Sequence, residues 1–392
     1  MDIMLPTNEG RMRPYRLSGC PAAAPPSGAP RSRIGYAAAH VVADPLADVE
    51  PGEPARLDWE ATLAFRRHLW SLGLGVAEAM DTAQRGAGLD WAAARELIAR
   101  SAAEAAACGG RFAAGAGTDH LPVPSAPAAV PGDLAAVRAA YEEQCAFVEG
   151  HGARVVLMAS RALCAVARGP DDYAAVYGAV LSGLRRPAIL HWLGEAFDPA
   201  LAGYWGSADP DRAADHCLAI IRDNAAHVDG IKTSLLDASL EVRLRRRLPP
   251  GVRMYTGDDF HYPELIAGDD AGHSDALLGI FDAIAPAAAA ALHALDGGDR
   301  EAYDRALAPT VPLSRHIFRA PTHRYKTGIV FLAYLAGHQA HFRMVGGQES
   351  ARSLPHLAEC FRLADAAGLL PDPERAVARM RRVLALAGLD GG

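Results

Sequence analysis

The two lysines of this chain are the residues whose type says most about possible chemistry. Lysine and arginine together number 39, yet only Lys232 and Lys326 are lysines. In a sequence that uses arginine so heavily, a retained lysine is a candidate for chemistry that a guanidinium cannot perform. A deprotonated amine can attack a carbonyl carbon, whereas arginine, with a pKa above about 12, stays protonated. Lys232 follows an apolar stretch and precedes a polar turn in VDGIKTSLLD (228–237), which is typical of a reactive lysine at the end of a buried strand.

The composition is that of an ordinary globular protein. Half of the 392 residues are hydrophobic and 22% are charged, and the net charge of −7 argues against nucleic acid or an anionic membrane as the main partner. No apolar run reaches the roughly 18 residues of a membrane span. Residues 1–30 lack the apolar centre of a signal peptide, so we expect a cytoplasmic protein. The six cysteines show no CxxC spacing and are expected to be reduced thiols: Cys20, Cys108, Cys145, Cys164, Cys217 and Cys360.

Short apolar runs alternate with longer segments of helical period. The predicted strands are 33–43, 75–80, 111–117, 153–160, 187–193, 228–234, 252–257 and 275–281. The predicted helices are 59–72, 89–107, 133–149, 171–184, 211–226, 239–247 and 286–295. This alternation predicts a (β/α)8 TIM barrel; an open doubly wound sheet is the alternative, but no nucleotide-binding glycine pattern is present. We expect an extended N-terminal arm over 1–30, the barrel over 31–298 and a helical C-terminal subdomain over 299–392.

A barrel of this kind places its active site where the strands end. The polar residues at these ends form one candidate site. Lys232 and His191 are the candidate catalytic residues, because an amine can form an imine and imidazole exchanges protons near neutral pH. The candidate substrate-binding residues are Asp81, Thr82, Arg85, Thr118, Asp119, Arg161, Trp192, Ser234, Asp258 and Asp259.

Five motifs in this order resemble those of one enzyme family. They are GAGTD (115–119), GIK (230–232), YTGDD (255–259), LLGIFDAIAP (277–286) and FRAPTHRYKTG (318–328). The chain resembles, over roughly 33–345, the dihydrodipicolinate synthase and N-acetylneuraminate lyase family, and within it an uncharacterised branch. The resemblance implies a class I aldolase or lyase in which Lys232 forms the Schiff base. It gives Lys326 a mainly structural role.

Two segments depart from the pattern of that family. The second-strand loop of the family, Gly-Thr-Thr-Gly-Glu, corresponds here to AEAMDTAQRG (77–86). The fifth-strand Tyr-Asn-x-Pro, whose tyrosine carries protons, corresponds to HWLG (191–194), which puts His191 in the place of the tyrosine. Carbonyl chemistry on Lys232 is compatible with both changes, but the carbonyl donor is left open.

The remaining polar residues allow more than one interpretation. The aspartates could hold the hydroxyl groups of a sugar-like substrate, and Arg85 and Arg161 could bind an anionic group. Alternatively, two or three aspartates with His191, Glu195 or His261 could hold a divalent cation. We expect a small-molecule carbonyl substrate, no cofactor or metal, and a homodimer or homotetramer. The alternatives are a metal-dependent sugar isomerase or epimerase, and a non-catalytic ligand-binding barrel.

Overall fold

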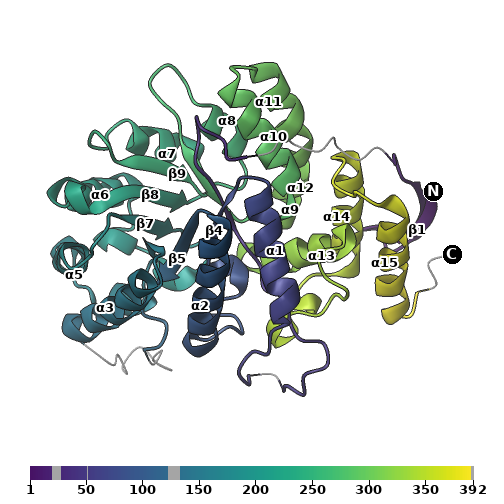
Figure 1. Cartoon of the computed structure of the whole chain (residues 1–392), viewed down its shortest axis with the longest axis horizontal. Helices are drawn as coiled ribbons and strands as arrows, with labels where there is room; N and C mark the ends of the chain where they lie inside the picture. The colour runs from purple at the N-terminus through teal and green to yellow at the C-terminus, as the bar shows by residue number, and fades with distance from the viewer. Residues whose placement is uncertain (20–27, 51, 122–132, 390–392) are drawn as a thin grey trace.

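The computed structural model describes residues 1–19, 28–50, 52–121 and 133–389. Eight parallel strands form a closed barrel, in which the last strand pairs with the first (Figure 1). The strands are β3 (Gly35–Ala38), β4 (Gly75–Glu78), β5 (Phe112–Ala116), β6 (Arg154–Leu157), β7 (Ala188–Leu193), β8 (Val228–Ser234), β9 (Arg253–Thr256) and β10 (Asp275–Leu278). Each lies within one of the predicted ranges, and the predicted (β/α)8 fold is confirmed.

The side chains of each strand alternate between the inside and the outside of the barrel. Val156 and Ile189 belong to the buried cluster inside it. Their neighbours Leu157 and Leu190 belong to the apolar layer between the barrel and the surrounding helices. Because the period of a strand is two residues, this register decides which strand-end side chains can meet at the barrel mouth.

Helices surround the barrel and follow the strands in order. They are α1 (Trp59–Ser71), α2 (Trp91–Cys108), α3 (Leu134–Gly150), α4 (Arg161–Val166), α5 (Pro170–Ser182), α6 (Pro210–Asp223), α7 (Ala238–Arg245), α8 (Tyr262–Ala267), α9 (Ile280–Ala283) and α10 (Ala285–Asp296). Aspartate N-caps fix where several of them begin: the side chains of Asp58, Asp90 and Asp133 each accept a backbone N–H from the first turn. These caps set the residue at which each loop ends and the following helix begins.

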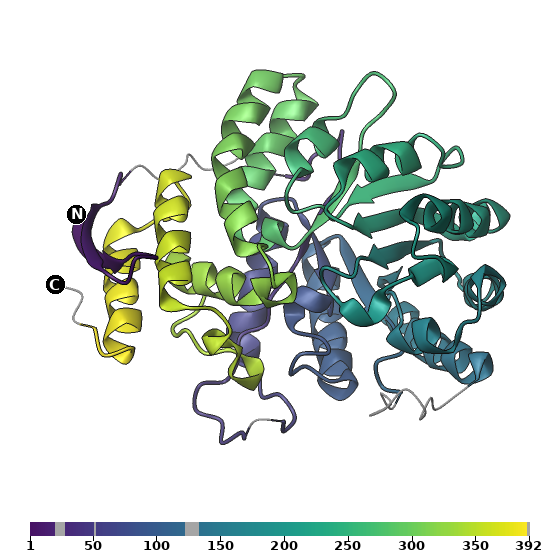
Figure 2. The ribbon, with the colours of Figure 1, turned by 180° about the vertical axis from the view of Figure 1, so that it is seen from behind.

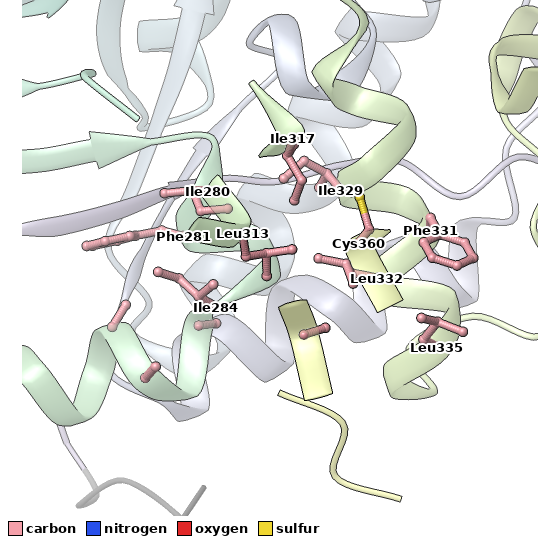
Figure 3. Packing of buried hydrophobic residues seen from close by; sticks show 14 of the residues in the cluster. Ile280, Phe281, Ile284, Leu313, Ile317, Ile329, Phe331, Leu332, Leu335 and Cys360 are labelled. Carbon is pink, nitrogen blue, oxygen red and sulfur yellow. The ribbon is translucent and has the colours of Figure 1, made fainter. Parts of the chain in front are cut away.

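Five further helices complete the described C-terminal region: α11 (Arg300–Leu307), α12 (Val311–Ile317), α13 (Tyr325–Ala336), α14 (Leu354–Ala366) and α15 (Pro373–Leu386). They lie to one side of the barrel (Figure 2). Figure 3 shows that their apolar side chains meet those of α9 and α10 in a continuous core; the labelled residues are Ile280, Phe281, Ile284, Leu313, Ile317, Ile329, Phe331, Leu332, Leu335 and Cys360. The barrel and the C-terminal helices share one core. The predicted division into a barrel (31–298) and a C-terminal subdomain (299–392) therefore remains a proposal.

The first residues form a packed hairpin where a loose arm was expected. Strands β1 (Asp2–Pro6) and β2 (Met12–Arg16) pair antiparallel and lie beside the C-terminal helices in both views (Figures 1 and 2). The Tyr15 hydroxyl and the Ser18 backbone N–H both donate to Asp365 on α14, each at 2.8 Å. The signal in the sequence was the alternation of Ile3 and Leu5, both buried, before a turn that ends at a glycine.

Two expectations from composition concern the whole chain. No helix within the described residues is both long and apolar enough to cross a membrane. The five cysteines of the described residues are free thiols, and Cys20 lies outside those residues.

Candidate active site

A cavity of about 980 Å³ opens at the carboxyl ends of the barrel strands. Its wall is formed by loops that follow β4, β5, β6 and β7, and by the segment that leads into α13. Of the predicted site residues, the following line it: Asp81, Arg85, Thr118, Asp119, Arg161 and His191. The structure therefore brings together half of the predicted set around one hollow.

Lys232 does not itself line this cavity; it lies inside the barrel next to His191, which does. Its neighbour Ile231 faces the outer layer, so Lys232 points inward, and it is 4% exposed. Burial lowers the pKa of Lys232, and Asp81 and Asp259 oppose that shift when they are ionised. Gly257 leaves room for the lysine, because a Cβ there would lie 2.7 Å from Lys232 Cε. The amine is thus confined in a place that favours its neutral, nucleophilic form.

His191 connects Lys232 with the cavity. It is the register partner of Lys232 across β7 and β8, and its Nε2 lies 3.2 Å from Ser234 Oγ. Burial, followed by the positive charge of Lys232, lowers the pKa of His191 well below its usual value. The imidazole is therefore neutral near pH 7 and can accept a proton, whereas the sequence had suggested that it would serve as both acid and base.

The two adjacent aspartates after β9 have different environments. Burial raises the pKa of Asp259 well above its usual range, and Asp259 Oδ1 accepts the Ile280 N–H at 2.9 Å. Asp258 accepts the backbone N–H groups of Phe260 and His261, and its Oδ2 lies 2.9 Å from His261 Nδ1. Asp258 therefore caps the loop, while Asp259 is the carboxyl group near Lys232.

Buried Arg85 forms an ion pair with the partly exposed Asp119 at the cavity wall. Arg85 Nε and Nη2 donate to the two oxygens of Asp119 at 2.9 and 2.7 Å, and Nη1 donates to the Gly115 carbonyl at 2.7 Å. Burial alone would raise the pKa of Asp119, but its hydrogen bonds, first those with Arg85, lower it to about 2. Gln144 on α3, which the sequence analysis missed, also bonds both side chains. The charge of Arg85 is thus neutralised within the protein.

A tyrosine from the C-terminal helices enters the site. The Tyr325 hydroxyl on α13 donates to Asp81 Oδ2 at 2.9 Å and lies 2.5 Å from Thr82 Oγ1. Burial raises the pKa of Tyr325 well above its usual value, so the phenol keeps its proton. The sequence had marked the segment 318–328 only as a structural stretch and did not single out Tyr325.

The rim after β6 carries a second set of polar contacts. Arg161 Nε pairs with Asp198 Oδ2 at 2.5 Å, and its side chain is half-exposed. Thr118 Oγ1 lies 2.6 Å from Ser160 Oγ, which also caps α4. Lys326 lines the cavity opposite these residues, where the resemblance had implied a mainly structural role.

The prediction for Trp192 is corrected by the register of β7. His191 faces the barrel interior, so Trp192 faces the other side, where it packs among outer-layer residues with its ring 6.3 Å from that of Trp205. Trp192 does not line the cavity. It packs in the layer between barrel and helices and is not placed to contact a ligand.

The predicted aspartate and histidine set does not gather as a metal-binding group. Among the described residues, the one group of three close His, Cys, Asp or Glu side chains is His316, His356 and Cys360. These residues belong to α12 and α14 of the C-terminal region. The barrel mouth, as described, therefore offers no ready set of ligands for the isomerase alternative.

Comparison with protein families gives one assignment. The model of a family described as "Protein of unknown function (DUF993)" matches residues 3–389. The chain belongs to the DUF993 family. Comparison with curated protein sequences gives no match for this DUF993 protein.

Solved structures resemble this DUF993 protein in fold. A protein from Pseudomonas aeruginosa, proposed to be a dihydrodipicolinate synthetase, has a TM-score of 0.63 and 18% identity and covers 86% of this chain and 100% of its own. The dihydrodipicolinate synthase from Aquifex aeolicus has a TM-score of 0.58 and 12% identity, with 92% and 99% covered. That from Bacteroides thetaiotaomicron has a TM-score of 0.57 and 17% identity, with 78% and 90% covered. The resemblance to the dihydrodipicolinate synthase and N-acetylneuraminate lyase family is therefore confirmed for the fold.

Proposed function

We propose that this DUF993 protein is a class I aldolase or lyase in which Lys232 forms a Schiff base with a small polar carbonyl compound. The observation that carries the proposal is the place of Lys232, which is buried in the barrel beside the cavity-lining His191. Burial lowers its pKa, and a neutral amine is the form that attacks a carbonyl group. The fold shared with dihydrodipicolinate synthases supports the same chemistry.

The first step is imine formation. The Lys232 nitrogen bonds to the carbonyl carbon as the C=O π electrons move to oxygen, which takes up a proton. The carbinolamine then loses water and becomes an iminium. Asp259, whose pKa is raised by burial, is the proposed donor of the proton that helps water to leave. The substrate would reach Lys232 past His191 and Asp81, the two cavity-lining residues that adjoin the amine.

The second step uses the iminium as an electron sink. Either the C–C bond to a hydroxyl-bearing carbon breaks, as that hydroxyl loses its proton and becomes a carbonyl group, or a proton leaves the adjacent carbon. In both cases the electron pair moves into the enamine. His191 is the proposed acceptor of the proton, because it pairs in register with Lys232, lines the cavity and is neutral before the transfer. Ser234, in contact with His191 Nε2, would keep that nitrogen oriented. Association as a homodimer or homotetramer is part of the proposal.

The test is borohydride trapping followed by intact and peptide mass analysis. Keto acids, keto sugars and small aldehydes would be incubated with wild type and Lys232→Arg. Because the chain has only two lysines, the position of an adduct can be assigned without ambiguity. We expect an adduct on Lys232 of the wild type and none in the variant, with circular dichroism showing that both are folded.

Other outcomes would point to the alternative functions. Absence of any adduct, together with turnover abolished by a chelator, would favour the metal-dependent isomerase. Tight binding of a compound without turnover, unaffected by Lys232→Ala, would favour the ligand-binding barrel. An adduct on Lys326 instead of Lys232 would refute the proposed assignment of the nucleophile.

A further inference from the structure

The cavity wall opposite the barrel strands carries a group of cationic side chains. His323, Arg324 and Lys326 come from the segment that leads into α13, and Arg161 faces them from α4. All four line the cavity that reaches down to His191. Two of its carboxylates are already engaged, since Asp119 pairs with Arg85 and Asp198 with Arg161.

Lys326 has no internal partner for its charge. Within the described residues it forms no ion pair and no hydrogen bond through its side chain, and its Nζ lies 5.9 Å from the centre of the Tyr325 ring. Arg324 likewise forms no ion pair with a described residue. Lys326 is only partly exposed and lines the open cavity, whereas Arg324 lines the same cavity from an exposed position. Cations left unpaired in such a place are suited to an anionic ligand.

The charges of this group act on one another. Burial lowers the pKa of Lys326, Asp81 opposes the shift, and the positive charge of Arg161 adds to it. Burial, then Arg324 and Lys326, lower the pKa of His323. An anion among these side chains would relieve their mutual repulsion. The charge of Asp81 acts on both Lys326 and Lys232, so one carboxylate lies near both lysines.

We infer that the substrate is itself an anion, whose carboxylate or phosphate group binds at Lys326 and Arg324 while its carbonyl group reaches Lys232. Only the part of this inference that places the carbonyl group at Lys232 rests on the proposed function. It assigns the two lysines of the chain to the two ends of one ligand. The C-terminal helices would then determine specificity, while the barrel supplies the nucleophile.

The test compares carbonyl compounds that differ in charge at the far end. Laevulinate is matched with 5-hydroxypentan-2-one, and dihydroxyacetone phosphate with dihydroxyacetone, so that the pairs distinguish a carboxylate from a phosphate. The rate of borohydride trapping on Lys232 is measured at low ionic strength and subsaturating concentration. In wild type we expect at least one anionic compound to be trapped about tenfold or more faster than its neutral match, as for a charge-assisted contact.

Three variants locate the source of that preference. Lys326→Met should bring the ratio of anionic to neutral trapping towards one, and Lys326→Arg should retain most of it, because it keeps the charge. Arg382→Met, at an exposed position on α15, makes the same change in net charge and should keep the wild-type ratio. A ratio that is the same in Lys326→Met and wild type, or no anionic preference in wild type, would overturn the inference and leave the imine chemistry standing.

A second measurement separates this inference from the proposed function. If wild type traps no compound at all, the Schiff-base proposal fails, and the anion site is judged by calorimetric titration with inorganic phosphate. Binding to wild type that is lost in Lys326→Met and kept in Arg382→Met would support the site. Equal binding to wild type and Lys326→Met, or no binding to either, would refute it.

Discussion

Gly257 offers a direct test of how tightly the barrel holds Lys232. An alanine Cβ at this position would lie 2.3 Å from Ser234 Oγ, 2.7 Å from Lys232 Cε and 2.7 Å from the Thr233 carbonyl oxygen. The Thr233 oxygen cannot move freely, because it accepts the Gly257 N–H at 2.8 Å within the barrel. The added methyl group must therefore displace the strand β9 backbone or the side chains of Ser234 and Lys232.

The expected size of the effect follows from these contacts. Overpacking a filled interior costs about 1–3 kcal/mol of unfolding free energy, and we expect Gly257→Ala to lie within that range. A reacting group displaced by about 1 Å can lose on the order of 100-fold in rate. The rate of imine trapping on Lys232 should therefore fall by about one to two orders of magnitude, even in the fraction of protein that remains folded.

Urea denaturation measures the first effect, and borohydride trapping with the best carbonyl compound measures the second. Gly150→Ala is the matched control, because Gly150 is helical and a Cβ there would meet no atom within 4 Å. The control should be neutral or more stable by up to about 1 kcal/mol. If Gly257→Ala behaves like Gly150→Ala in both assays, Lys232 is not held against Gly257 and the reasoning fails.

Two ion pairs give further predictions. Glu78→Gln removes the charge that pairs with Arg66 at 2.8 Å, where both side chains are fully buried. The free energy of unfolding, measured by urea denaturation, should fall by about 3–5 kcal/mol. A loss below about 1 kcal/mol would contradict this prediction. Because the pKa of Asp119 is lowered to about 2 from 3.8, its ionisation stabilises the fold above about pH 4, by about 1 kcal/mol once solvent screening of its partly exposed carboxylate is allowed for. That contribution should be lost as the pH falls from about 4 to 2, so the unfolding free energies of wild type and Asp119→Asn should converge over this window, and a constant difference would count against it.

The barrel itself could be predicted because its signal is local. Each strand is a short apolar run between segments of helical period, and each predicted range contains one barrel strand. Seven of the eight predicted ranges are longer than the strand, as 33–43 is for β3 (Gly35–Ala38), because the sequence does not show where the hydrogen-bonded pairing of strands stops. The N-terminal hairpin was missed because its apolar face is covered by α14, far along the chain.

The candidate site was predicted in part. Every polar residue at a strand end is an equal candidate in the sequence, but only alternate residues face the interior. His191 therefore lines the cavity, while its neighbour Trp192 packs on the outside. Pairing also could not be foreseen, because the partners of Arg85 come from a different βα loop and from α3.

The amino-acid sequence by itself determined the barrel and the identity of Lys232 as its unusual residue, because periodicity, residue type and strand position are properties of neighbouring residues. The tertiary structure alone decided what surrounds that lysine. Burial among Asp81, Asp259 and His191 sets its protonation, and the packing of α13 against the barrel mouth brings Tyr325 to Asp81 and Lys326 to the cavity wall. These contacts join residues far apart in the chain, and only the closed barrel with its covering helices brings them together.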